Sequence, residues 1–264
     1  MRKVGGGAVP FPQPLSNAAA RPHGSRDFIA ATAALVGSAT WRCQGAAPLI
    51  QQPATRGTVV LFQGDSVTDC GRDRSATDAN AAGALGSGYP LLVASAALAA
   101  RPDGGLKFYN RGVSGNKVPD LQERWAHDTL DLKPDVLSIL IGVNDFWHKL
   151  SKGYTGTVQD YESQYTALLT QTRQALPSVR LIVLEPFVLR CCAVNEQWFP
   201  EFTARQTAAA QVASRAGATY VPLQAVFDER VRTAPPQYWA SDGVHPTVAG
   251  HAVIAEQWRR TAGL

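Results

Sequence analysis

From residue 58 onward, short runs of apolar and β-branched residues alternate with longer amphipathic or alanine-rich stretches. Each short run predicts a buried strand, because a strand covered on both faces is apolar throughout. These runs are 58–62, 106–109, 136–141, 180–184 and 219–221. The longer stretches predict helices at 88–100, 120–132, 158–176, 201–216 and 247–260. Strands that alternate with helices indicate an α/β domain in which a five-stranded parallel sheet carries helices on both faces.

The first 55 residues differ from the rest of the chain and are rich in Gly, Pro and Ala. Residues 28–41 form an uncharged run of 14, too short for a bilayer span of about 20 residues but typical of the apolar core of an export signal. The residues around Arg26 resemble a twin-arginine signal that lacks its second arginine. We therefore expect 1–55 to be an export leader and linker, and 56–264 to be the folded domain. The expected location is periplasmic or extracellular, with a cytoplasmic protein as the alternative.

The net charge of +4 belongs to the N-terminal segment. Residues 1–56 carry six basic side chains and one acidic one, whereas the remaining 208 residues hold 19 basic and 20 acidic ones. A nearly neutral body without a stripe of Lys and Arg argues against a nucleic-acid partner. The four cysteines form no Cys-x-x-Cys pair, so we expect no structural metal and no cofactor.

Four polar clusters lie where predicted strands end or where the last predicted helix begins, at 64–66, 111–116, 142–145 and 242–246. Open α/β sheets bind ligands beyond the carboxyl ends of their strands. We therefore expect the first three clusters to converge at one edge of the sheet, with the fourth entering from a loop near the C-terminus. Ser66 is the candidate nucleophile, because it lies just past the first strand on a turn that begins with glycine.

An ester hydrolase built on Ser66 also needs a base, a group that orients the base, and donors for the oxyanion. His245 is the candidate base, because a residue before proline adopts extended backbone and is free to point at the sheet edge. Asp242, three residues earlier, is placed to orient the imidazole. We expect oxyanion donors from the backbone N–H groups of Ser66 and Gly112 and from the side-chain amide of Asn144.

Each of these residues also has a purely structural interpretation. Ser66 is a suitable helix cap, Gly112 a suitable turn glycine, and Asn144 and Asp242 are common turn residues. Their joint occurrence, in order and at strand ends, favours catalysis over four unrelated structural roles.

Asp65 and three aromatic residues flank the polar clusters. Trp147 follows the third cluster, and Tyr238 and Trp239 precede the fourth. We expect these residues to bind substrate, the aromatic rings serving as a platform for a sugar or as the wall of a small acyl pocket. Ordinary packing is the alternative for the aromatic residues.

The octapeptide FQGDSVTD resembles block I of the GDSL, or SGNH, hydrolase superfamily. Gly112 in NRGVSGN matches the block II glycine, and Asn144 in GVND matches the block III asparagine. Asp242 and His245 in DGVHP match block V. The resemblance implies a flavodoxin-like, three-layer α/β/α fold, a Ser66–His245–Asp242 triad, and an oxyanion hole made by Ser66, Gly112 and Asn144.

Four further stretches, GDSVTDCGR, LGSGY, DLQERW and DLKPD, resemble the bacterial acetylxylan-esterase branch of this superfamily. That resemblance implies a serine esterase that deacetylates xylan or xylo-oligosaccharides through an acyl-enzyme, with a small-molecule or oligosaccharide ester as its partner. A lysophospholipase or thioesterase with the same triad would act on longer acyl chains instead. The motifs are also compatible with a metal-dependent phosphoesterase and with a non-catalytic carbohydrate-binding protein on the same fold.

Overall fold

The computed structural model describes residues 55–264. The expected export leader lies outside the described residues and stays a prediction. The described chain contains five parallel strands in the order β2-β1-β3-β4-β5, which is the order of flavodoxin-like sheets. The strands are β1 (Val59–Gly64), β2 (Lys107–Asn110), β3 (Val136–Leu140), β4 (Arg180–Leu184) and β5 (Thr219–Val221). The predicted parallel α/β sheet is therefore confirmed.

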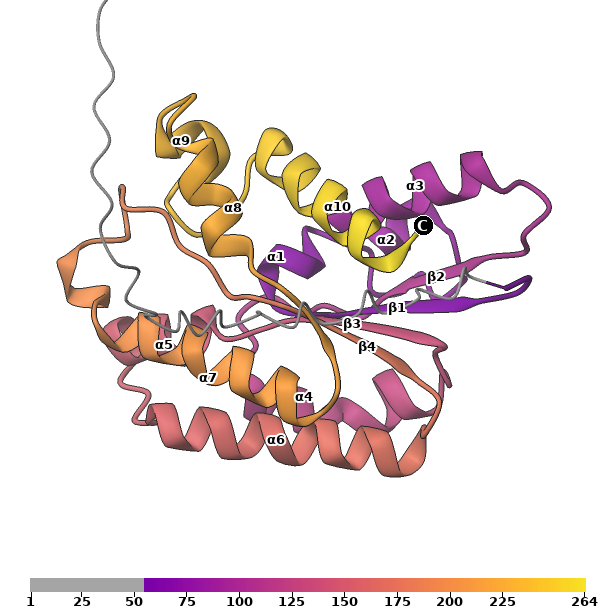
Figure 1. The fold of residues 1–264 in the computed structure, drawn as a ribbon, viewed down its shortest axis with the longest axis horizontal. Coiled ribbons are helices and arrows are strands. Elements are labelled where there is room, and N and C mark those ends of the chain that lie inside the picture. The colour runs from indigo at the N-terminus through magenta and orange to yellow at the C-terminus, as the bar shows by residue number, and fades with distance from the viewer. Residues whose placement is uncertain (1–54) are drawn as a thin grey trace, which may run out of the picture. The chain divides into compact units, whose positions relative to one another are not determined.

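Helices cover both faces of this sheet (Figure 1). One face carries α1 (Ser66–Asp69), α2 (Ala82–Leu85), α3 (Tyr89–Ala100), α8 (Leu223–Arg230), α9 (Pro236–Trp239) and α10 (Val248–Ala262). The other face carries α4 (Val118–Trp125), α5 (Val143–Lys152), α6 (Val158–Ala175) and α7 (Glu201–Arg215). None of the helices described in 55–264 is both long enough and apolar enough to cross a membrane.

The hydrophobic core forms one layer on each side of the sheet. Successive strand residues point to opposite faces, so Val60 and Phe62 pack with Trp258 of α10, while Leu61 between them packs with Trp125 of α4. Both layers are fully buried at these positions. This two-sided burial explains why the strands appeared in the sequence as continuous apolar runs.

The structure contains several short or polar helices that the sequence pattern did not predict, and one predicted helix is divided. No helix was predicted at the polar cluster 142–145, but α5 begins there, directly after Gly142 at a φ of +133°. The helix predicted at 120–132 is α4 followed by a π-helical segment, Ala126–Leu130. The sequence pattern also missed α1, α2, α8, α9 and a 3₁₀ turn at Glu196–Trp198. These elements are short or begin with turn-forming residues, so they lack a sustained period of 3.6.

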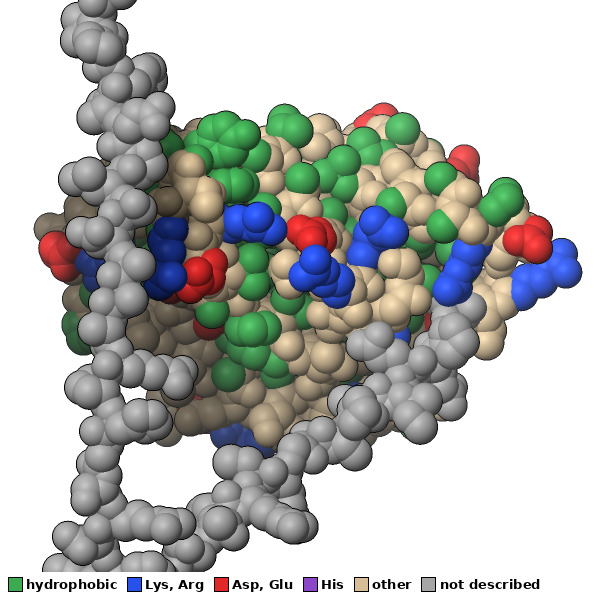
Figure 2. Space-filling model, turned by 45° about the horizontal axis from the view of Figure 1, so that its top comes forward, with side chains coloured by type: hydrophobic (Ala, Val, Ile, Leu, Met, Phe, Trp, Pro, Cys, Tyr) green, Lys and Arg blue, Asp and Glu red, His purple; other side chains and the backbone are tan. Residues whose placement is uncertain are grey.

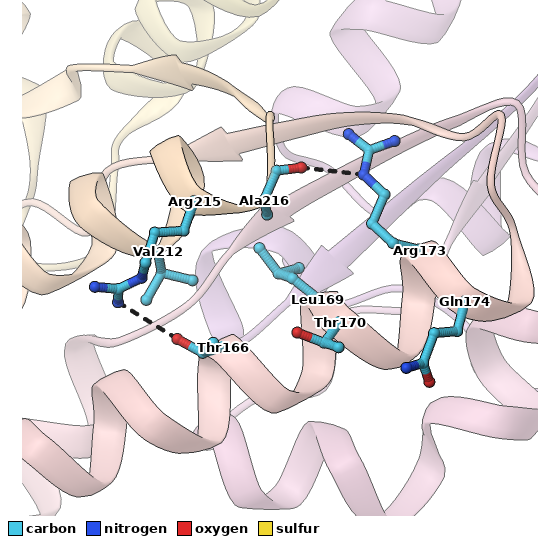
Figure 3. Close-up of a pocket in the computed structure, with 8 residues that line it drawn as sticks. All are labelled: Thr166, Leu169, Thr170, Arg173, Gln174, Val212, Arg215 and Ala216. Carbon is cyan, nitrogen blue, oxygen red and sulfur yellow. Dashed lines mark hydrogen bonds between the residues drawn. The ribbon is translucent and has the colours of Figure 1, made fainter.

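A groove between α6 and α7 has a volume of about 380 Å³ (Figure 3). Its floor is apolar, with Leu169 and Val212, and Arg173 borders it at one end. The Arg173 guanidinium donates to the carbonyl oxygens of Val179 and Ala216, which lie just before β4 and β5. The groove therefore lies toward the amino ends of these strands, away from the edge where α/β sheets place their sites.

The described surface mixes charges of both signs. On the face shown in Figure 2, Lys and Arg side chains are interspersed with Asp and Glu. In α10, for example, Glu256 pairs with Arg260 at 2.6 Å and with Arg230 of α8 at 3.3 Å. This arrangement agrees with the near-zero net charge of the body of the chain.

Candidate functional site

Ser66 is the first residue of α1, directly beyond the carboxyl end of β1. Asp65 caps this helix, because its Oδ1 accepts a hydrogen bond from the Val67 N–H at 3.0 Å. The cap leaves the Ser66 hydroxyl free to make a long-range contact. Its Oγ lies 2.9 Å from Nε2 of His245, 179 positions later in the chain.

The loop before α10 joins His245 to Asp242. Nδ1 of His245 lies 2.7 Å from Oδ2 of Asp242, so the imidazole donates from Nδ1 and can accept the Ser66 proton at Nε2. Oδ1 of Asp242 accepts the backbone N–H groups of Val244 and His245 at 2.9 and 2.7 Å. Burial alone would raise the pKa of Asp242, but the hydrogen bonds from His245 and Val244 outweigh it and lower that pKa. The carboxylate therefore stays ionised at neutral pH.

The turn that carries Asp242 is held by the neighbouring segment. Leu189 donates its N–H to the Gly243 carbonyl at 2.7 Å, and Ala193 donates to the Asp242 carbonyl at 3.1 Å. Gly243 has a φ of +91°, and a Cβ there would lie 2.6 Å from the Leu189 oxygen. Glycine at this position therefore allows the tight turn by which the carboxylate reaches the imidazole.

The sheet order explains why the serine and Asn144 meet. The strand order reverses between β1 and β3, and such a switch point opens a crevice at the carboxyl ends of the two strands. Ser66 follows β1, and Asn144 lies in the first turn of α5, just after β3. Nδ2 of Asn144 donates to the Asn116 carbonyl at 3.2 Å, which leaves its second N–H available to a substrate oxygen.

Gly112 does not fit the role that the sequence predicted for it. Its N–H is donated to Oδ1 of the buried Asn110 at 2.8 Å. Nδ2 of Asn110 in turn donates to the carbonyls of Thr68 and Leu85 at 2.6 and 2.9 Å. Gly112 thus belongs to the scaffold that joins β2 to α1 and α2, and its N–H is not free for an oxyanion.

Gly115 offers a free N–H in the same motif, which the sequence pattern did not single out. Its N–H has no hydrogen-bond partner within 55–264, and its φ is +84°. The residues before and after Gly115 in the chain are held by the two helices of the site. Ser114 donates to Asp69 of α1, and the Asn116 carbonyl accepts from Asn144 of α5. The second glycine in the motif NRGVSGN was the only sequence signal for this position.

The predicted substrate-binding residues separate into two groups. Trp147 lies at the site, with its ring centroid 5.7 Å from that of His245. Trp239 is only 9% exposed and packs in the core, while Tyr238 is 55% exposed and stacks edge-on against it at 4.9 Å. Asp65 is 1% exposed, so the prediction that it binds substrate is wrong: its carboxyl faces the interior as a helix cap.

A cluster of buried apolar side chains connects α5 to the loop that carries His245. Phe146 of α5, Trp198, Phe202 of α7 and Val244 all belong to it. Trp147 packs against its edge, with ring centroids 5.8 Å apart between Trp147 and Trp198. Packing of this kind limits relative movement of Asn144 and His245, which a preorganised site requires.

Two buried carboxyls lie behind the site. Burial raises the pKa of Asp65 and that of Asp145 to about 7, despite backbone hydrogen bonds from Val67 and Val118 that act in the opposite direction. Oδ2 of Asp145 has no partner in the described part of the chain. Both groups therefore favour their protonated form more strongly in the folded protein than in the unfolded chain.

Asp145→Asn is expected to weaken the dependence of stability on pH. A carboxyl whose pKa is raised by folding contributes stability that is complete below its unfolded pKa of 3.8 and is lost as the pH rises to about 7. Between about pH 5 and pH 8, the free energy of unfolding of the wild type should therefore fall by about 2 kcal/mol more than that of the variant. Urea denaturation at both pH values measures this difference. Asp103→Asn, at an exposed position, is the control, and equal pH dependence in wild type and Asp145→Asn would contradict the assignment.

The cysteines take no part in the hydrogen-bonded chain from Ser66 to Asp242. Cys70, Cys191 and Cys192 are free thiols, and Cys43 lies outside the described residues. In the described portion, no three His, Cys, Asp or Glu side chains are grouped as they would be to hold a metal ion.

Comparison with known proteins identifies the family. The sequence profile of the GDSL-like lipase/acylhydrolase family matches residues 62–253. The chain is 36% identical over 213 residues to an acetylxylan esterase of Geobacillus stearothermophilus, covering 78% of this chain and 94% of that protein. A crystal structure of the same organism's acetylxylan esterase Axe2 has a TM-score of 0.72 at 34% identity, covering 81% of this chain and 97% of Axe2.

A second solved structure, assigned to the GDSL-like lipases of Parabacteroides merdae, has a TM-score of 0.77 at 45% identity. The match covers 79% of this chain and 97% of that one. Sequence, fold and site geometry thus agree. The chain belongs to the GDSL-like lipase/acylhydrolase family and is a carboxylic ester hydrolase.

Proposed function

We propose that the protein is a serine esterase that removes acetyl groups from carbohydrate, such as acetylated xylan or xylo-oligosaccharides. The observation that carries this proposal is the continuous chain of contacts from Ser66 Oγ to His245 Nε2 and from His245 Nδ1 to Asp242 Oδ2, at 2.9 and 2.7 Å. A serine hydroxyl is a weak nucleophile by itself, and such a chain supplies the base that activates it.

The reaction proceeds in two halves. Ser66 Oγ attacks the acetyl carbonyl carbon while His245 Nε2 takes the serine proton, and Asp242 stabilises the imidazolium that forms. The oxyanion accepts hydrogen bonds from the N–H groups of Ser66 and Gly115 and from Nδ2 of Asn144. His245 then protonates the departing sugar oxygen, which leaves Ser66 acetylated. A water molecule that gives its proton to His245 attacks the acetyl-enzyme, and His245 then returns the proton to Ser66 Oγ as acetate is released.

Variants of the relative Axe2 support these roles. Solved structures of Axe2 include catalytic mutants in which a serine, an aspartate or a histidine is replaced by alanine. In Axe2 the aspartate precedes the histidine by three positions and the serine precedes it by 179. The spacing of Asp242 and Ser66 relative to His245 is the same here.

The relatives favour a short acyl group. The protein of Geobacillus stearothermophilus that is 36% identical to this chain over 213 residues is an acetylxylan esterase, and the acyl group that such an enzyme removes is acetyl. A lysophospholipase or thioesterase would act on longer acyl chains instead.

Hydrolysis of p-nitrophenyl esters of increasing chain length tests the proposal, together with acetate release from acetylated xylan. We expect kcat/KM to be highest for the acetate ester and to fall by at least about tenfold at the octanoate, since each poorly accommodated group raises the barrier by kcal/mol amounts. Acetate release from xylan should be detected at the same time. A maximum at eight carbons would favour the lipid alternative, and no hydrolysis of any ester would favour a carbohydrate-binding protein.

A further inference from the structure

A second concave site lies beside the loop that orients the candidate base. It is a cavity of about 380 Å³ between the segment at 188–199, α7, α8 and the start of α9, within the range of about 300–1,000 Å³ of small-ligand sites. One of its walls includes Leu189, whose N–H is donated to the Gly243 carbonyl in the turn next to Asp242. Leu189 therefore both lines the cavity and holds the turn from which Asp242 orients His245. Ser66 does not line the cavity.

Gln206 of α7 presents an unused acceptor to this cavity. It is only 8% exposed, and its Nε2 donates to the Pro186 carbonyl at 3.0 Å and to Oε1 of Gln224 at 2.9 Å. Both amide hydrogens are thus engaged, and reversing the amide would set Oε1 against two acceptors. Oε1 of Gln206 has no partner among the described residues. This oxygen is not one of the fully enclosed polar atoms that lack a partner, so water or a ligand hydroxyl can reach it and donate to it.

A fixed network of hydrogen bonds leads from Gln206 to the rim of the cavity. Oε1 of Gln224 accepts from Gln206 and from the Val188 N–H, and Nε2 of Gln224 donates to the Val188 carbonyl and to Oδ1 of Asp228. Every polar atom of the Gln224 amide is therefore satisfied. The second oxygen of the exposed Asp228 carboxylate remains available at the rim.

The rest of the rim supplies donors and an apolar surface. Arg190 lies over the Phe199 ring, with 3.8 Å between the guanidinium carbon and the ring centroid, and it also pairs with Glu196. Thr203 adds an exposed hydroxyl. Because Arg190 already has a carboxylate partner and Asp228 contributes a negative charge, the described lining of the cavity offers no spare cation with which to hold an anion.

We propose that this cavity binds a neutral sugar unit of the carbohydrate chain, as a subsite separate from the one at Ser66. Sugar hydroxyls both donate and accept: they can donate to Gln206 Oε1 and to Asp228, and accept from Arg190. The sugar ring would pack against the apolar part of the lining, which includes Leu189, Val231 and Pro236. The assignment of a xylan-type chain rests on the proposed function, whereas the polar geometry of the cavity does not depend on it.

Calorimetric titration with xylotetraose, which carries no acetyl group, tests the subsite without requiring turnover. Thr203→Trp places a large ring at the mouth of the cavity from an exposed helical position, and we expect it to weaken xylotetraose binding by at least about tenfold. Gln211→Trp, at an exposed position of the same helix that does not line the cavity, should bind as the wild type does. Both variants should hydrolyse p-nitrophenyl acetate at the wild-type rate.

A second variant keeps the test decisive if Thr203→Trp fails to fold. Asp228→Ala removes the rim carboxylate at an exposed position and should also weaken binding severalfold. The inference is overturned if wild type binds xylotetraose with a Kd weaker than about 10 mM, or if both cavity variants bind as tightly as wild type. Xylotetraose binding is measured without ester hydrolysis. Failure of the esterase proposal would therefore appear in the hydrolysis assays, and failure of the subsite proposal would appear in the titrations.

Discussion

Ser66→Ala is expected to lower kcat for p-nitrophenyl acetate by about 10⁵-fold or more. The substitution removes Ser66 Oγ, the candidate nucleophile, which lies 2.9 Å from His245 Nε2. Without this hydroxyl no acyl-enzyme can form, and only the binding of the ester and the oxyanion donors remain to assist attack by water. Stopped-time assays at high enzyme concentration, with mass spectrometry to detect acetylated protein, measure both consequences.

The loss must be separated from misfolding. Ser66 is half-buried and its side chain makes no other hydrogen bond in the described residues, so the variant should unfold at nearly the same temperature as the wild type. Ser163→Ala, on the exposed side of α6, is the matched control and should keep full activity. Retention of more than a small fraction of activity by Ser66→Ala would show that another group is the nucleophile.

Asp242→Asn is expected to lower kcat by about 10⁴-fold at neutral pH while leaving the fold intact. Asp242 accepts the Nδ1 hydrogen of His245 at 2.7 Å and two backbone N–H groups with its other oxygen. An asparagine can keep the backbone contacts through Oδ1, but its Nδ2 donates where Oδ2 accepted. The imidazole then favours the opposite tautomer, in which Nε2 carries the hydrogen and cannot take the proton of Ser66.

The pH profile distinguishes this cause from a general structural defect. If the tautomer is responsible, kcat of Asp242→Asn should recover partly at high pH, where hydroxide can replace the base, and KM should change little. Asp131→Asn, which alters an exposed turn, should match the wild type. A loss smaller than tenfold would mean that His245 is oriented by its packing against Trp147 and not by Asp242.

Local patterns were sufficient to predict the strands and the contacts of His245 with Ser66 and Asp242. The predicted strands at 180–184 and 219–221 coincide with β4 and β5, and the other three differ by one or two residues at their ends. Buried parallel strands are apolar throughout, so they stand out against amphipathic helices. The site motifs were visible because each follows a strand or precedes a helix, which is a one-dimensional property.

Local patterns failed where a residue's role depends on what surrounds it in space. Gly112 and Gly115 lie in the same short motif, and only the contact with Asn110 shows that the Gly112 N–H is already used. Trp147 and Trp239 are alike in sequence context, yet α5 presents one beside His245 while the core encloses the other. The cavity at Gln206 is formed by segments from four parts of the chain, and no motif marks it.

The sequence by itself determined that this protein has a parallel α/β sheet, a serine after the first strand and an Asp-x-x-His pair before the last helix. Periodicity and motif spacing are properties of neighbours along the chain, so they are visible before any folding is considered. Only the tertiary structure decided which N–H groups are free, which aromatic rings reach the site, and that a second polar cavity lies beside it. Those outcomes depend on contacts between residues far apart in sequence, whose geometry is set by packing around the whole sheet.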